Sequence, residues 1–325
     1  MSQKPDSNKT RDAVSLGETM LLFQAEEYGA LRHNERFRKF IGGTESNTMM
    51  ALAKLGLTAS WISRLGADEF GYNIRDFIRG QGVDTSGVVF DQEAPTGVFF
   101  VEKNAMDETR SLYYRAGSAA SRMNFQDLDL DFISQHRILH LTGITPVLSP
   151  TCAELTARLI SEAKARGMKV SLDPNLRLTV APAERFRELI RPLLSQVDIF
   201  LPGEGELLLL TGARGLEEAI QWAQEAGAAR LAIKLGAKGS LLVKGEERIA
   251  QPPFPVKRIV SSMAAGDAFN AGFLAAELKG RPEEEGLKLG NCMGALVSLA
   301  WGPYEGLPDW ETVRAYLGGE GVVER

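Results

Sequence analysis

The sequence of 325 residues has only two cysteines and three histidines, and none of them belongs to a metal-binding or redox motif. Cys152 and Cys292 lie in segments with helical patterning, and no histidine or second cysteine stands near either at the spacing of a zinc site. A disulfide framework and a structural zinc site are therefore disfavoured. We predict that both cysteines are buried, reduced and apolar in their behaviour.

A basic face and a long apolar run are also missing. The formal net charge is −5, with acidic and basic residues interspersed, so no face can neutralise a nucleic-acid backbone or an anionic membrane. No apolar run approaches the ~20 residues of a membrane span, and the first residues lack the apolar core of a signal peptide. We expect a cytoplasmic protein with a disordered segment at 1–11 and a small-molecule partner.

The familiar nucleotide-binding loops are absent as well. The chain contains neither G-x-x-x-x-G-K-[ST] nor a G-x-G-x-x-G run between a strand and a helix. A P-loop and a dinucleotide-binding fold are thus unsupported. If the protein binds phosphate, it must do so in another way.

Short apolar runs alternate with amphipathic segments along most of the chain. Residues 138–142, 168–173, 197–201 and 231–235 are typical of strands buried on both faces, and residues 149–167 and 216–227 are typical of helices. Strands that alternate with helices pair in parallel through right-handed crossovers. We predict a single α/β domain over residues 12–325, a three-layer doubly wound fold with a mostly parallel sheet. Its ligands would bind at the carboxyl ends of the strands.

Two segments interrupt this alternation, at about 25–40 and 95–117. The second has two β-rich pieces around a polar turn at 104–107. We predict that both segments contribute to a small β-sheet that projects from the main domain as a lid.

Small residues lead into a lone aspartate late in the chain, in the run AAGD at 264–267. Small side chains let backbone N–H groups approach an anion, and the positive end of a following helix would face the same point. Asp267 would then lie beside a phosphoryl group. On spacing alone, the alternative that Asp267 only caps the helix stays open.

At this point the chain resembles the ribokinase-like (pfkB) family of carbohydrate kinases. The resemblance is carried by AGDAF at 265–269 with GF at 272–273, by GGTESN at 42–47, and by KLG at 54–56. Further matches are GADEFG at 66–71, TG at 96–97, DPN at 173–175, the glycine-rich turn of IKLGAKG at 233–239 and GNCMGALV at 290–297. They are collinear over nearly the whole chain.

The resemblance implies ATP-dependent phosphorylation of a sugar hydroxyl. Asp267 would be the base that accepts the hydroxyl proton, and the backbone amides of Ala264, Ala265 and Gly266 would form the anion hole. The different class that stays open is a sugar- or nucleotide-binding homologue with weak transfer activity. The family often dimerises through the lid, so a homodimer is expected.

For the nucleotide, the resemblance implies contacts from a set that lies mostly in the second half of the chain: Asn175, Lys234, Gly236, Gly239 and Asn291. Glu206 would help to hold Mg²⁺, largely through water, although Gly203 replaces the asparagine of the family's motif. Ser261 replaces an aspartate near a loop that binds a monovalent cation in many members, so a cation requirement is not carried over.

For the sugar, the runs LYYRAG at 112–117 and DPNLR at 173–177 resemble the 2-keto-3-deoxygluconate kinase branch of the family. Two arginines suit a substrate with a carboxylate, because a guanidinium binds it in a two-pronged, charge-assisted way. The implied substrate-binding residues are Gly42, Gly43, Asn47, Phe99, Tyr113, Arg115 and Arg177. Phe99 stands where the branch often has a tyrosine.

A kinase of a neutral sugar, such as fructose, ribose or a nucleoside, is the alternative. Ribokinase-type members carry a sugar-binding aspartate just after the first strand, and we expect residues 14–23 to supply only apolar side chains at that place. Position 264 leaves a second question open. If it needs a positive φ, alanine costs about 1 kcal/mol relative to glycine.

Overall fold

The computed structural model describes residues 9–103 and 109–318. The turn expected at 104–107 and most of the segment expected to be disordered lie outside the described residues. The first strand begins at Arg11.

A large sheet runs through the middle of the domain, in the order β13-β12-β11-β10-β9-β8-β1-β4-β5. Its strands are β1 (Arg11–Leu16), β4 (Ala59–Gly66), β5 (Val88–Asp91), β8 (His136–Thr142), β9 (Lys169–Asp173), β10 (Ile199–Phe200), β11 (Leu231–Lys234), β12 (Ser240–Lys244) and β13 (Glu247–Gln251). Neighbouring strands from β11 to β5 pair in parallel, and β12 and β13 add an antiparallel edge. The predicted mostly parallel α/β architecture is confirmed.

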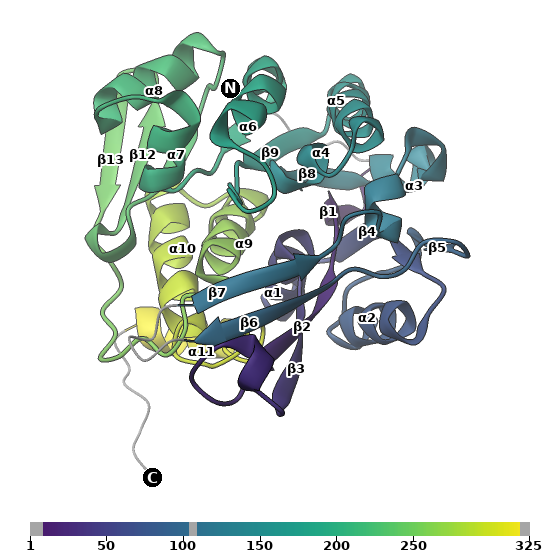
Figure 1. The fold of residues 1–325 in the computed structure, drawn as a ribbon. Helices are drawn as coiled ribbons and strands as arrows, with labels where there is room; N and C mark the ends of the chain where they lie inside the picture. The colour runs from purple at the N-terminus through teal and green to yellow at the C-terminus, as the bar shows by residue number, and fades with distance from the viewer. Residues whose placement is uncertain (1–8, 104–108, 319–325) are drawn as a thin grey trace.

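Helices cover both faces of this sheet, so the strands are buried on two sides as their apolar runs predicted. One face is covered by α1 (Thr44–Lys54), α2 (Glu69–Gly80), α9 (Ala265–Leu278), α10 (Glu283–Val297) and α11 (Trp310–Leu317). The other is covered by α3 (Leu130–Ser134), α4 (Ile144–Val147), α5 (Pro150–Ala165), α6 (Ala183–Ile190), α7 (Glu204–Thr211) and α8 (Leu216–Glu225). Figure 1 shows α4, α5 and α6 above the sheet and α1, α9 and α10 below it.

The predicted helix at 149–167 shows how its ends are set by sequence. Ser149 precedes α5, and its hydroxyl accepts a hydrogen bond from the N–H of Cys152 at 3.1 Å. Pro150 then occupies the first helical position, where a missing N–H does no harm. Gly167 follows the helix with φ +68°, a left-handed conformation that glycine adopts without strain.

The lid is a separate four-stranded sheet in the order β3-β2-β6-β7. Its strands are β2 (Met20–Ala25), β3 (Phe37–Gly42), β6 (Val98–Lys103) and β7 (Thr109–Tyr114). Within 95–117, β6 and β7 are the two β-rich pieces that the sequence indicated, whereas the segment 25–40 lies mostly between two strands. The strand β2 was not predicted, although Gly17, Glu18 and Thr19 separate its apolar run from that of β1.

The fold places the lid opposite the carboxyl ends of β1, β8, β9 and β11. No helix in the described part of the chain is long and apolar enough to cross a membrane. Cys152 and Cys292 are both buried and unbonded to each other, as predicted.

Candidate active site

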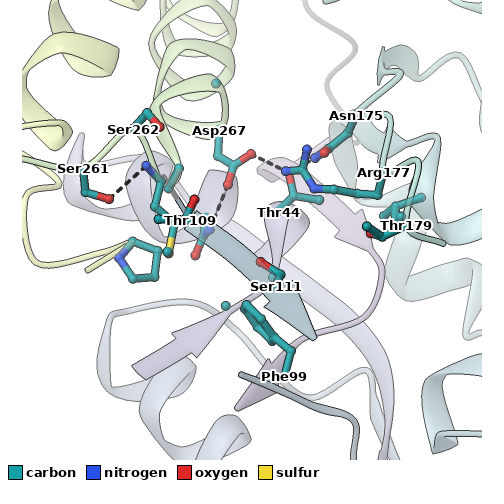
Figure 2. Close-up of a pocket in the computed structure, with 18 of the residues that line it drawn as sticks. Thr44, Phe99, Thr109, Ser111, Asn175, Arg177, Thr179, Ser261, Ser262 and Asp267 are labelled. Carbon is teal, nitrogen blue, oxygen red and sulfur yellow. Dashed lines mark hydrogen bonds between the residues drawn. The ribbon is translucent and has the colours of Figure 1, made fainter. Parts of the chain in front are cut away.

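A large pocket of about 1410 Å³ separates the lid from the carboxyl ends of the main strands. The sequence-predicted residues that line it are Gly42, Gly43, Asn47, Phe99, Tyr113, Arg115, Asn175, Arg177, Glu206, Lys234, Ala264, Gly266 and Asp267. They come from both sheets and from the helices α1, α7 and α9. Residues far apart in sequence thus meet at one place (Figure 2).

Asp267 lies in the first turn of α9 and points into this pocket (Figure 2). Its Oδ1 accepts a hydrogen bond from the hydroxyl of Thr44 at 2.5 Å, and its Oδ2 accepts one from the side-chain amide of Asn47 at 2.8 Å. Asn175 in turn donates its amide to the Thr44 hydroxyl at 2.6 Å. The aspartate is therefore not the cap of its own helix, and its carboxylate is oriented by side chains from α1.

Burial raises the pKa of Asp267 above its usual value, and the nearby Asp173 charge acts in the same direction. The hydrogen bonds from Thr44 and Asn47 oppose this shift without cancelling it. In its ionised form, a carboxylate with a raised pKa is a better proton acceptor than an ordinary one.

The helix α9 begins after Ala264, whose φ is +61° and ψ +9°. This is the left-handed region, so the question raised by the sequence is answered: position 264 does need a positive φ. Ala264, Ala265 and Gly266 lie at the positive end of α9, where no side chain caps the helix, and the N–H of Ala265 donates to the carbonyl of Ser262 at 3.3 Å.

Lys234 ends β11 beside this helix terminus. Its ammonium donates to Oδ2 of Asp173 at 2.6 Å and to the side-chain oxygen of Asn270 at 3.3 Å. A Cβ added at Gly266 would lie only 3.5 Å from the same nitrogen. Burial works against ionisation of Asp173, but Lys234, the amide of Asn270 and His140 together outweigh it and lower the pKa of that carboxyl. A fixed positive charge thus stands next to the start of α9.

Glu206 lies in the first turn of α7 with both carboxylate oxygens engaged. The N–H of Leu176 donates to Oε1 and that of Gly203 to Oε2, each at 2.9 Å. Burial, with the Asp173 charge beside it, raises the pKa of Glu206. Among the described residues, no group of three or more His, Cys, Asp or Glu side chains could hold a metal ion by itself.

Arg115 and Glu18 form a buried ion pair at the lid end of the pocket. Nε and Nη2 of Arg115 lie 2.7 and 2.5 Å from Oε2 of Glu18, and the Ser118 hydroxyl donates to Oε1 at 2.6 Å. The expectation that residues 14–23 supply only apolar side chains here is wrong, because Glu18 lines the pocket. Its two oxygens are nevertheless occupied, so it is not free to bind a sugar diol.

A model of the pfkB family of carbohydrate kinases matches residues 10–310. The chain belongs to this family. The resemblance stated from the motifs is thus confirmed, and with it the assignment as an ATP-dependent sugar kinase.

Named relatives of this kinase differ in the sugar that their names give. The chain is 34% identical over 316 residues to a 2-dehydro-3-deoxygluconokinase of Bacillus subtilis, covering 97% of this chain and 98% of the relative. It is 32% identical over 306 residues to fructokinase-1 of Oryza sativa subsp. japonica, covering 91% and 94%. A crystal structure of a PfkB protein from Polaromonas sp. JS666 superposes with a TM-score of 0.83 at 34% identity, covering 94% of this chain and 99% of that one.

The remaining residues predicted for the nucleotide lie outside the pocket lining of the kinase. Gly236 and Gly239 flank the short turn after β11, and both have positive φ. A Cβ at Gly239 would collide with the carbonyl oxygen of Gln251 at 2.1 Å. Asn291 of α10 donates to the carbonyl of Pro252 at 2.9 Å, so the two predicted contacts meet around residues 251–252.

The glycines at 42 and 43 let the lid strands approach α1. A Cβ at Gly43 would lie 2.3 Å from the Thr19 hydroxyl, and one at Gly42 would lie 3.0 Å from the ring of Phe99. That ring stacks on Tyr113 with 5.2 Å between the centroids. The pair forms an aromatic wall on the lid side of this kinase's pocket.

Sequence reasoning missed four polar residues that the pocket depends on: Glu18, Thr44, Glu45 and Asp173. Thr44 and Glu45 lie inside the quoted motif at 42–47, and Asp173 inside the motif at 173–175, but only their neighbours were assigned roles. For these three residues, the motifs therefore contained a sequence signal. What the sequence did not show is which side chains they contact.

Proposed function

We propose that this kinase phosphorylates a hydroxyl of a sugar acid, with 2-keto-3-deoxygluconate as its substrate. That compound is the 2-dehydro-3-deoxygluconate in the name of the Bacillus subtilis relative. The observation that carries the proposal is the charge of the pocket. Five cationic side chains and three anionic ones line it in the described residues, although the chain as a whole has a net charge of −5. Such a pocket favours ligands with several negative charges.

Arg177 is the residue best suited to a substrate carboxylate. It follows Leu176 at the pocket wall, is exposed, and forms no ion pair with any carboxylate among the described residues. Figure 2 shows its guanidinium beside Asp267 and Asn175. Arg115 is a weaker cation because Glu18 offsets its charge, but its Nη1 has no hydrogen-bond partner in the described part of the chain. That nitrogen can donate to the same substrate.

In this proposal, Asp267 accepts the proton of the substrate hydroxyl as the oxygen attacks the γ-phosphorus of ATP. The bond from the γ-phosphorus to the bridging oxygen breaks, and ADP leaves. The N–H groups of Ala264, Ala265 and Gly266 stabilise the charge on the transferred group, and the Lys234 ammonium lies close enough to assist. Mg²⁺ would neutralise charge on the ATP phosphates. Glu206 would hold the ion through its water shell rather than directly, because both Glu206 oxygens already accept backbone hydrogen bonds.

A neutral ketose is the second candidate, and the 32% identity to a fructokinase favours it. The decisive experiment measures ADP release with saturating ATP and Mg²⁺ over sugar acids and neutral sugars. We expect turnover with 2-keto-3-deoxygluconate and little with fructose or ribose. The reverse preference would refute the sugar-acid assignment.

Two variants make the same test at single residues. Arg177→Ala should raise KM for the sugar acid about 10- to 100-fold, since a charge-assisted hydrogen bond is lost, and Arg177→Lys should recover part of the loss. Asp267→Asn should abolish turnover while ATP still binds. A binding protein without transfer activity would be indifferent to that change. Dimerisation through the lid and a cytoplasmic location remain part of the proposal.

A further inference from the structure

Glu45, the second residue of α1, has a carboxylate that is fully enclosed. Its exposed fraction is 0%. The Thr142 hydroxyl donates to its Oε1 at 2.6 Å and the Thr145 hydroxyl at 2.9 Å, whereas Oε2 has no hydrogen-bond partner in the described residues. An enclosed carboxylate with one unpaired oxygen is costly to a fold, so its presence calls for a reason.

The enclosure depends on a glycine of the neighbouring strand connection. A Cβ added at Gly17, directly after β1, would lie 2.1 Å from Cδ of Glu45 and 2.3 and 2.5 Å from its two oxygens. The carboxylate therefore packs flat against the backbone at the carboxyl end of β1. No larger residue fits at position 17 while Glu45 keeps this position.

Glu45 stands between the two residues that orient the proposed catalytic base. Thr44 and Asn47 come from the same helical turn, and each donates to one oxygen of Asp267. Through Thr142 at the end of β8 and Thr145 in α4, Glu45 ties this turn to the main sheet.

We infer that Glu45 is a positioning residue for Asp267: it fixes the first turn of α1 to β8 and α4, and its charge acts on the aspartate that this turn holds. The inference rests on the proposed role of Asp267 as the base. It gives the kinase a second buried carboxyl group whose protonation state affects catalysis.

The electrostatic part follows from what surrounds the carboxylate. Burial raises the pKa of Glu45 to about 7, and the Asp267 charge contributes in the same direction. On β8, the Nδ1 of His140 is hydrogen-bonded to Ser171, and burial lowers the pKa of His140 to about 4, so this residue is neutral.

The other charged or titratable side chains on the strands and helix that pack against α1 are engaged elsewhere, in ion pairs or hydrogen bonds: Arg11, Asp12, Arg64, His136, Arg137 and Glu277. Among the described residues, none of these groups neutralises Glu45. A negative charge on Asp267 therefore disfavours a negative charge on Glu45, and by reciprocity the charge of Glu45 acts on Asp267.

The test compares Glu45→Gln with Glu45→Ala. Glutamine keeps an oxygen that accepts from the two threonines but cannot ionise, whereas alanine removes the link altogether. We expect Glu45→Ala to lose about 10- to 100-fold in kcat with KM for ATP within about threefold, because misplacement of a catalytic group affects the chemical step. Circular dichroism and ATP binding establish that each variant is folded.

The pH profile separates a positioning role from a merely structural one. In the wild type, kcat should rise roughly two- to fivefold through pH 7 as Glu45 ionises and makes Asp267 more basic. The kcat of Glu45→Gln should show no step near pH 7 and should stay, at higher pH as well, at the value that the wild type has below pH 7. If Glu45→Ala is unstable, the Glu45→Gln profile still decides the matter.

The outcomes distinguish this inference from the proposal beneath it. A folded Glu45→Ala variant with wild-type kcat, or a Glu45→Gln profile that keeps the step near pH 7, overturns the role of Glu45 alone, provided that Asp267→Asn is inactive. An Asp267→Asn variant that still turns over shows that Asp267 is not the base, and both conclusions then fall.

Discussion

Replacing Ala264 by glycine should relieve backbone strain at the start of α9. Ala264 has φ +61°, a left-handed conformation that costs an L-residue with a Cβ roughly 1–2 kcal/mol. Glycine avoids this cost but loses about 0.5–1 kcal/mol through the greater freedom of the unfolded chain. The net change in the free energy of unfolding should therefore lie between zero and a gain of about 1.5 kcal/mol.

Ala153→Gly is the matched control. Ala153 lies half-buried in α5, where the backbone is helical, so glycine there loses the same entropy and relieves no strain. We expect the control to be destabilised by about 0.5–1 kcal/mol. Because the unfolded-state contribution is common to both variants, the difference between them isolates the strain at position 264, about 1–2 kcal/mol.

Urea unfolding at pH 7 without nucleotide measures both free energies, and ADP release measures kcat. Glycine can keep the conformation of Ala264, so kcat should equal or exceed that of the wild type. Equal destabilisation by the two substitutions would show that position 264 carries no strain. A kcat about 100-fold or more below the wild type, a loss as large as that of one well-aimed donor, would show that the alanine methyl group itself supports the anion hole.

Three further predictions concern the buried charges. Gly17→Ala should cost about 1–3 kcal/mol of stability, since its Cβ overlaps Glu45, whereas Gly205→Ala, with open space around the added atom, should not destabilise; urea unfolding compares them. Lys234→Met should cost about 3–5 kcal/mol in thermal unfolding without ATP, because Asp173 is left buried without its cation, and Lys234→Met with Asp173→Asn should recover part of this. The pKa of Glu45 is about 7 in the fold against 4.5 in the unfolded chain, so the folded state holds the proton more tightly and stability falls as pH rises from 4.5 to 7. Glu45→Gln should remove about 3 kcal/mol of this fall. If the stability of Glu45→Gln depends on pH as that of the wild type does, the prediction is wrong.

The main sheet could be predicted because its sequence signals are local. Runs such as 138–142 and 168–173 are apolar throughout, which parallel strands with helices on both faces require. The boundaries of α5 follow from Ser149, Pro150 and Gly167. The strand β2 was not predicted, although the break at Gly17, Glu18 and Thr19 is an equally local signal that β1 ends before it.

The contacts within the site could not be predicted in the same way, because they join distant parts of the chain. Thr44 and Asp267 are 223 residues apart, and Glu18 and Arg115 are 97 apart. The motifs indicated that Asp267 and Arg115 matter. Only the fold shows that side chains of α1 hold the carboxylate of Asp267 and that Glu18 neutralises the charge of Arg115. A role assigned to a charged residue from its motif is incomplete until its partner is known.

Backbone strain gathers at the same place as these partners. In the described residues, Asn175 and Ala264 are the non-glycine residues with positive φ, at +37° and +61°, and both line the pocket. Asparagine tolerates this conformation through its short polar side chain, and here that side chain also donates to Thr44, which donates to Asp267. Alanine has no such compensation. The strain at Asn175 is thus offset by a hydrogen bond that helps to orient the base. The strain at Ala264 has no such compensation in its own side chain, and we expect it to persist because it sets the position of the backbone N–H groups that follow, which the proposed anion hole requires.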